Sequence, residues 1–190
     1  LGGYINRMTG RKMDLWNGGC HVHARFSEEA LLQLKEQYPN AKVLAHPECK
    51  ASILQHADVI GSTQALLDYA KKSLAETKNS LTSCEGIKPA LQFIVVTESG
   101  ILHEMQKACS EIDFIPVPAD IDNTTPSSTT PHHSTPHIAC QTTCNECEYM
   151  RMNTLEKLYK CLRNESNEMF VDEQVAKDAI LPIQRMLEMS

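Results

Sequence analysis

Ala41-Lys42-Val43-Leu44-Ala45-His46-Pro47-Glu48-Cys49 is the stretch of this chain that decides the fold. Its first five residues are mostly apolar and follow the helix-ending pair Pro39-Asn40, which predicts a short buried strand. The composition becomes polar at His46-Pro47-Glu48, immediately after the strand. A buried strand that runs directly into ionisable residues is typical of the ligand-binding edge of an α/β protein.

The pattern of this stretch recurs along the chain. Strand–loop–helix units cover residues 41–56, 57–76 and 92–110. Short apolar strands that alternate with helices predict a parallel sheet with helices on its faces, and therefore an α/β fold. In such sheets the ligand lies at the carboxyl ends of the strands. We therefore expect the strand ends to form the functional site; they carry His46-Pro47-Glu48, Ser62-Thr63 and Thr97-Glu98.

Other segments have weaker patterns. We expect residues 77–90 to form a loop, and the Pro/Ser/Thr/His-rich residues 117–139 to be a flexible loop because they have too few apolar side chains to bury. Cys109 and Cys161 lie in helical patterns and are predicted to be core thiols. The remaining expected elements are a helix ending at Gly10, a short strand over 13–16, a helix starting at Ser27, a strand over 114–116, and helices over 154–161 and 175–189.

Composition excludes several classes of function. The 190 residues carry a formal net charge of −6, so nothing in the overall charge favours nucleic-acid binding. No apolar run approaches the roughly 18 residues that a membrane span requires. The eight cysteines are too sparse for a secreted disulfide scaffold of this length, so we expect reduced thiols and a cytoplasmic location.

Three of the cysteines crowd into the segment Cys140-Gln-Thr-Thr-Cys144-Asn-Glu-Cys147. The C-x-x-C spacing within it is used by zinc sites, iron–sulfur sites and redox-active dithiols alike, so the spacing leaves these alternatives open. A structural zinc module would use all three thiols and a histidine of the preceding loop, whereas a redox dithiol would use only Cys144 and Cys147. Cys20 follows the turn Asn17-Gly18-Gly19, where a backbone can approach a ligand closely.

Five motifs follow one another along the chain: Trp16-Asn17-Gly18-Gly19-Cys20-His21-Val22-His23, His46-Pro47-Glu48-Cys49, Ala57-Asp58-Val59-Ile60-Gly61-Ser62-Thr63, Phe93-Ile94-Val95-Val96-Thr97-Glu98-Ser99-Gly100-Ile101 and Cys144-Asn145-Glu146-Cys147-Glu148-Tyr149-Met150-Arg151-Met152-Asn153-Thr154-Leu155. Taken in this order, they resemble the quinolinate synthase family, the 4Fe–4S enzymes of de novo NAD biosynthesis. The resemblance covers nearly the whole chain except residues 117–139.

The resemblance implies a particular domain organisation. The family fold has three similar three-layer α/β domains around a pseudo-threefold axis, each giving one cysteine to the cluster. By this comparison residues 1–26 end the second domain and residues 27–119 form the third. Residues 120–139 are then a flexible insertion, and residues 140–190 carry a cluster cysteine and the C-terminal helices. We expect the first domain, with the third cysteine ligand, to lie upstream of Leu1.

The resemblance also assigns roles to residues. Cys20 and Cys147 are the expected cluster ligands, whereas Cys49 and Cys144 are not. Glu48 and His46 are the expected catalytic residues. The substrates implied are iminoaspartate and dihydroxyacetone phosphate, and L-aspartate oxidase or aspartate dehydrogenase is the implied functional partner. The expected substrate-binding residues are His46, Pro47, Glu48, Ser62 and Thr63.

Overall fold

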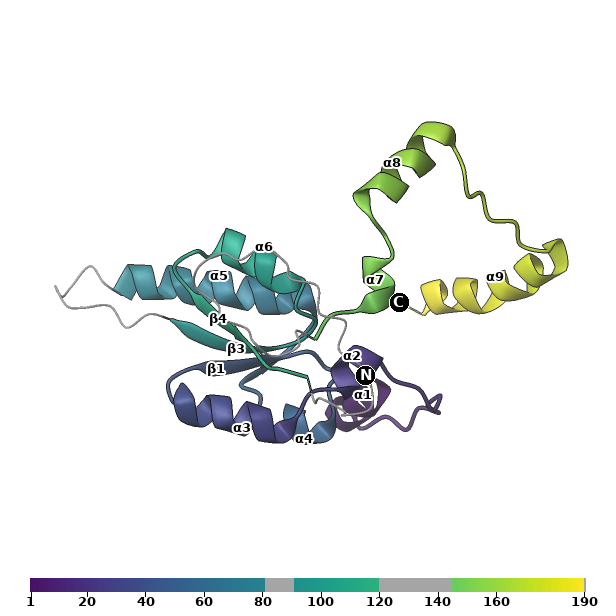
Figure 1. The fold of residues 1–190 in the computed structure, drawn as a ribbon. Coiled ribbons are helices and arrows are strands. Elements are labelled where there is room, and N and C mark those ends of the chain that lie inside the picture. The colour runs from purple at the N-terminus through teal and green to yellow at the C-terminus, as the bar shows by residue number, and fades with distance from the viewer. Residues whose placement is uncertain (81–90, 120–144, 190) are drawn as a thin grey trace. The chain divides into compact units, whose positions relative to one another are not determined.

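The computed structural model describes residues 1–80, 91–119 and 145–189 (Figure 1). The chain divides into two compact units, Leu1–Cys147 and Glu148–Ser190. The predictions for the loop at 120–139 and for Cys140 and Cys144 lie outside the described residues. Among the residues that are described, no helix is both long enough and apolar enough to cross a membrane.

The first unit is built on a parallel sheet. Its strands are β1 (Lys42–Ala45), β2 (Val59–Ile60), β3 (Gln92–Val96) and β4 (Asp113–Pro116), in the spatial order β2-β1-β3-β4. All three pairings are parallel. The α/β prediction is therefore confirmed, and the four strands lie where the apolar runs predicted them.

Helices cover both faces of this sheet (Figure 1). Because side chains alternate across a strand, Val43 and Ala45 pack on one face while Leu44 packs on the other. The first face is covered by α3 (Glu28–Gln37) and α4 (Ala51–Leu54), and the second by α5 (Thr63–Ser80) and α6 (Ile101–Ala108).

Local capping explains where the helices begin. Ser27 accepts a hydrogen bond from the Ala30 backbone at the start of α3, as its position before two glutamates predicts. Helix α5 continues to Ser80, so the predicted loop over 77–90 was wrong for its first four positions. Cys109 is 1% exposed, which confirms that it is a core thiol.

The chain before α3 contains two short helices, α1 (Gly2–Thr9) and α2 (His21–Ala24). Helix α1 ends where predicted, at Gly10, whose φ of 69° is left-handed. The strand expected over 13–16 was wrong. The Asn6 side chain donates to the Met13 carbonyl at 3.3 Å and accepts from the Met13 N–H at 3.1 Å, so it takes the groups that a neighbouring strand would pair with.

The second unit is helical and consists of α7 (Glu148–Arg151), α8 (Leu155–Asn164) and α9 (Glu173–Glu188). Thr154 caps α8 by accepting from the Lys157 backbone at 3.2 Å, as predicted. The prediction of Cys161 as a core thiol was wrong, because its side chain is only half-buried and its Sγ lies 3.1 Å from the Ser166 carbonyl.

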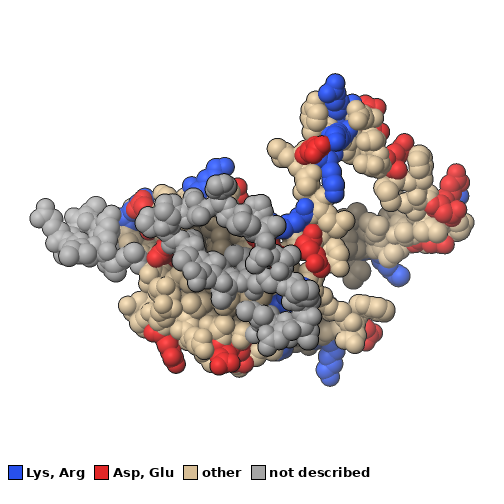
Figure 2. All heavy atoms as spheres, viewed as in Figure 1, with Lys and Arg blue, Asp and Glu red and all other residues tan. Residues whose placement is uncertain are grey.

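Charged side chains are spread over the first unit. On its visible face, Lys and Arg side chains are scattered among acidic ones rather than gathered in a single patch (Figure 2).

Candidate active site at the carboxyl ends of β1 and β3

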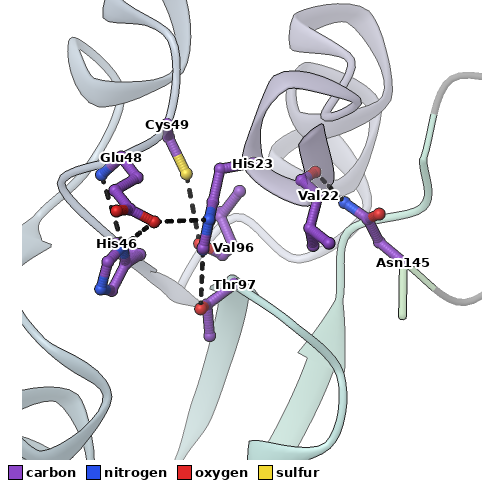
Figure 3. A network of polar contacts seen from close by, with 8 residues as sticks. All are labelled: Val22, His23, His46, Glu48, Cys49, Val96, Thr97 and Asn145. Atoms are coloured by element: carbon purple, nitrogen blue, oxygen red, sulfur yellow. Dashed lines mark hydrogen bonds and ion pairs between the residues drawn. The ribbon is translucent and has the colours of Figure 1, made fainter. Parts of the chain in front are cut away.

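Two neighbouring strands deliver the polar residues of the site. Strand β1 pairs with β3 so that Ala45 faces Val96. The residues that follow these two positions, His46 and Thr97, therefore emerge side by side at the carboxyl edge of the sheet (Figure 3). His46-Pro47-Glu48-Cys49 closes a turn in which the Cys49 N–H donates to the His46 carbonyl at 3.0 Å. Proline suits the second position of such a turn because its φ is already restricted.

Helix α2 adds His23 to these strand ends. The His23 ring lies between two partners, with Nε2 3.1 Å from Thr97 Oγ1 and Nδ1 3.2 Å from Glu48 Oε2 (Figure 3). His23 is 6% exposed and Thr97 is 4% exposed, so this contact is shielded from water. Within the described part of the chain, the ring therefore has one hydrogen-bond contact, from Nε2 to Thr97, while its Nδ1 lies beside the Glu48 carboxylate without a hydrogen bond.

His46 completes the group beside His23 and Glu48. Its ring stacks on that of His23, with centroids 4.6 Å apart and an angle of 22° between the planes. Its Nδ1 accepts the Glu48 backbone N–H at 3.3 Å and lies 3.7 Å from the Glu48 carboxylate. Two imidazoles therefore face one carboxylate, an arrangement suited to moving protons and to holding an anionic group.

Two cysteines adjoin this group in different ways. Cys20 precedes α2, and its Sγ lies within 4.8 Å of a His23 nitrogen and a Glu48 oxygen. Cys49 is buried, and its thiol donates to the Val96 carbonyl at 3.4 Å. Burial raises the pKa of Cys49 to about 12, which disfavours the thiolate that metals require.

Comparison with known proteins supplies the family. The family described as quinolinate synthetase A protein matches residues 1–188. The chain belongs to this family. Relatives named quinolinate synthase from Microcystis aeruginosa and Chloroherpeton thalassium are 47% and 45% identical to it over 190 residues. The match covers all of this chain but 49% of each relative, so the chain spans about half their length.

In this quinolinate synthase family member, the segment around Cys147 is held at the same carboxyl edge of the sheet. The Asn145 side chain donates from Nδ2 to the Val22 carbonyl at 2.6 Å. The backbone carbonyl of Asn145 accepts from the Ser99 N–H at 3.2 Å. The Cys147 N–H donates to Glu98 Oε1 at 3.3 Å. The structure thus brings the segment of Cys147 against the α2 helix that follows Cys20 (Figure 3).

The histidines of this site are poised in their neutral forms. Burial lowers the pKa of His23 below its ordinary 6.5, and the neighbouring His46 lowers it further, while Glu48 and Glu98 oppose this change. Burial likewise lowers the pKa of His46 against the opposing effect of Glu48. Neutral imidazoles can each donate at one nitrogen and accept at the other, as proton transfer requires.

Ser62 and Thr63 follow β2 at the same edge of the sheet. Ser62 is exposed and its hydroxyl accepts from the Ala65 N–H at 3.2 Å, which caps the start of α5. Thr63 is the first residue of that helix and is also exposed. The structure therefore places both at a helix N-terminus, and their contact with substrate stays a prediction.

Sequence reasoning missed two residues of the site, His23 and Asn145, whereas Thr97 was among the strand-end residues expected there. His23 lies three positions after Cys20, a spacing that places two side chains on one face of a helical turn. That signal could have marked it as a partner of the cysteine. Asn145 had no comparable signal, because its role depends on contacts with the distant residues Val22 and Ser99.

Proposed function

We propose that this chain forms part of the active site of a quinolinate synthase, which condenses iminoaspartate with dihydroxyacetone phosphate to give quinolinate, phosphate and water. The observation that carries the proposal is the convergence of His23, His46 and Glu48 beside Cys20 at the carboxyl ends of β1 and β3. L-aspartate oxidase or aspartate dehydrogenase is the kind of enzyme that would supply the imine.

The thiols of the chain fit the 4Fe–4S cluster that this reaction uses. Cys20 and Cys147 are both half-buried, and Asn145 links their segments by its hydrogen bond to Val22. Cys49, in contrast, is buried, and its thiol donates to the Val96 carbonyl. We propose that Cys20 and Cys147 hold the cluster together with a cysteine upstream of Leu1. An iron without a protein ligand would supply Lewis acidity toward a substrate oxygen.

Glu48 is the group best placed to exchange protons with the substrate. Its carboxylate is partly exposed, with 33% of the side chain accessible, and it lies against the buried ring of His23. One face of the carboxylate can therefore reach a bound substrate while the other is held by the protein. We assign it the role of general acid and base in the tautomerisation and dehydration steps.

Anionic groups of the substrates need donors at the same edge of the sheet. His46 can donate to a carboxylate or a developing oxyanion, because its side chain remains 18% accessible. Pro47 restrains the turn that carries His46 and Glu48 and so restricts the relative orientation of their side chains. The N-terminus of α5, with Ser62 and Thr63, offers backbone N–H groups of the kind that bind phosphate.

The test uses the full-length protein, reconstituted anaerobically with iron and sulfide. Cys20→Ser and Cys147→Ser should each abolish the broad cluster absorbance and quinolinate formation, whereas Cys49→Ala should retain both. Cluster absorbance that survives in either serine variant would remove that cysteine from the ligand set. A fully loaded wild-type protein that forms no quinolinate would overturn the proposed reaction.

A further inference from the structure

Cys20, His23 and Glu48 form a group of one thiol, one imidazole and one carboxylate. Their ligand atoms all lie within 4.8 Å of one another. These three ligand types are the ones that bind zinc in proteins, and three protein ligands with one open position is the common form of a non-structural zinc site. From this geometry we infer that the chain binds a single zinc ion at Cys20, His23 and Glu48 whenever Cys20 is not engaged by a cluster.

The distances fit one small cation. Two ligands at tetrahedral angles, with bonds of about 2.0–2.3 Å, stand roughly 3.3–3.6 Å apart. His23 Nδ1 and Glu48 Oε2 are already 3.2 Å apart. The Cys20 side chain is only half-buried, so a rotation about its χ1 angle can bring the sulfur closer.

His23 supplies an independent argument for a ligand. Its Nδ1 is buried and makes no hydrogen bond to any part of the chain that the structure describes, despite its proximity to the carboxylate. A buried nitrogen without a hydrogen bond is costly, and a cation between Nδ1 and Glu48 would satisfy both atoms. If Nε2–H donates to the Thr97 hydroxyl, the Nδ1 lone pair points toward that cation.

Thr97 would then act as the outer partner that orients the ligand. Histidines that bind metals usually donate their other ring N–H to a protein oxygen, which fixes the tautomer. Thr97 Oγ1 lies 3.1 Å from His23 Nε2 and meets this requirement. His46 does not belong to the ligand set, because its Nδ1 already accepts the Glu48 backbone N–H at 3.3 Å.

Zinc at this position would have a consequence for the proposed enzyme. Cys20 cannot serve a zinc ion and an iron–sulfur cluster at once, so zinc would block cluster loading. This consequence rests on the proposed function, whereas the zinc site itself rests only on the three side chains. The two ideas are separable because the zinc site does not use Cys147.

The experiment measures zinc and cobalt binding to the 190-residue chain, reduced and stripped of metal. It uses the background Cys140→Ser/Cys144→Ser/Cys147→Ser, which removes the alternative thiol cluster. We expect one zinc ion in competition with a chromophoric chelator, and a thiolate-to-cobalt charge-transfer band with Co²⁺. Cys20→Ser should remove this band.

Further variants assign the other ligands. His23→Gln and Glu48→Gln should weaken zinc binding by more than the roughly 10–100-fold loss expected for the outer-partner variant Thr97→Val. Cys49→Ala is the matched control and should bind zinc like the background chain. Circular dichroism and thermal unfolding check each variant, and if His23→Gln does not fold, Glu48→Gln and Cys20→Ser decide.

Two results would overturn the inference. One is the absence of stoichiometric zinc in the background chain. The other is unchanged zinc affinity after Cys20→Ser. Neither result would affect the proposed function, which depends instead on cluster loading through Cys20 and Cys147 and on quinolinate formation in the full-length protein.

Discussion

His23 Nδ1 lies 3.2 Å from Glu48 Oε2, and this contact joins helix α2 to the turn after β1. The His23 ring is also stacked on His46, so the carboxylate meets a rigid pair of imidazoles on one side. Glu48 itself remains partly exposed. These contacts hold the Glu48 carboxylate in a position suited to proton transfer, and each residue around it can be substituted separately.

Glu48→Gln should preserve the fold and the cluster of the full-length protein, because the two side chains are nearly the same size. Turnover should fall by roughly 10²–10⁴-fold, the range usual for a positioned acid or base. The measurement is the rate of quinolinate formation together with the cluster absorbance. Near-normal turnover with an intact cluster would exclude Glu48 from the mechanism, and loss of the cluster would give it a structural role.

Thr97→Val should destabilise the chain, since it leaves the buried Nε2 of His23 without its partner at 3.1 Å. We expect the free energy of unfolding to decrease by about 1–3 kcal/mol, the cost of an unsatisfied buried polar group. Urea unfolding of the 190-residue chain measures it. Thr77→Val is the control; its hydroxyl donates to Ser73 within one helix, and we expect a change within about 0.5 kcal/mol. Equal effects of the two substitutions would contradict the role given to Thr97.

Cys49 and Cys109 should resist alkylation in the native chain. They are 6% and 1% exposed, and burial raises the pKa of both, that of Cys49 to about 12. The half-buried Cys20, Cys147 and Cys161 should react before these two. Peptide mapping after iodoacetamide treatment, with and without guanidinium, gives the order. Rapid native labelling of Cys49 would show that its contact with Val96 is not maintained.

Asn145→Ala should release the segment of Cys147. The substitution removes a 2.6 Å hydrogen bond to Val22 and leaves that carbonyl without the amide, in a place where Asn145 is only 3% exposed. We expect faster alkylation of Cys147 and a less stable first unit. The control is Asn40→Ala, because Asn40 is exposed in the turn before β1. An unchanged rate at Cys147 would show that Asn145 does not hold the segment.

Glu28 should make stability depend on acid pH. Its Oε1 accepts from His56 Nε2 and Gln55 Nε2, both at 2.8 Å, and the hydrogen bond from His56 is the main cause that lowers the Glu28 pKa below its ordinary 4.5. A lowered folded pKa contributes stability above pH 4.5 that is lost as pH falls through the folded pKa.

Glu28→Gln should therefore reduce the acid sensitivity of the chain while changing little below that range. The measurement is urea unfolding across a series of acid pH values. Glu29→Gln is the matched control, because it removes the same charge from the same turn of α3, where Glu29 is exposed. The same slope in the wild type and Glu28→Gln would show that the link to His56 contributes nothing.

Local patterns determined the architecture of this chain from the sequence alone. The apolar run of Val43, Leu44 and Ala45 predicted a buried strand, and because neighbouring side chains of a strand point to opposite sides, this run packs on both faces of the sheet. Ser27 and Thr154 marked helix starts, because a hydroxyl at that position satisfies a backbone N–H that has no partner within the helix. His46 and Glu48 were placed at the sheet edge by their position directly after β1.

Only the tertiary structure decided which residues meet there. His23 reaches Glu48 and Thr97, and Asn145 reaches Val22, through contacts between segments far apart in the chain. Such contacts depend on the direction in which α2 packs against the strand ends, and no spacing within one segment encodes that direction. The strand expected over 13–16 failed for a related reason: a strand needs a neighbour to pair with, and the Asn6 side chain takes the backbone groups of Met13 instead. Periodicity and capping act within a few residues, whereas the site is assembled by packing across the whole unit.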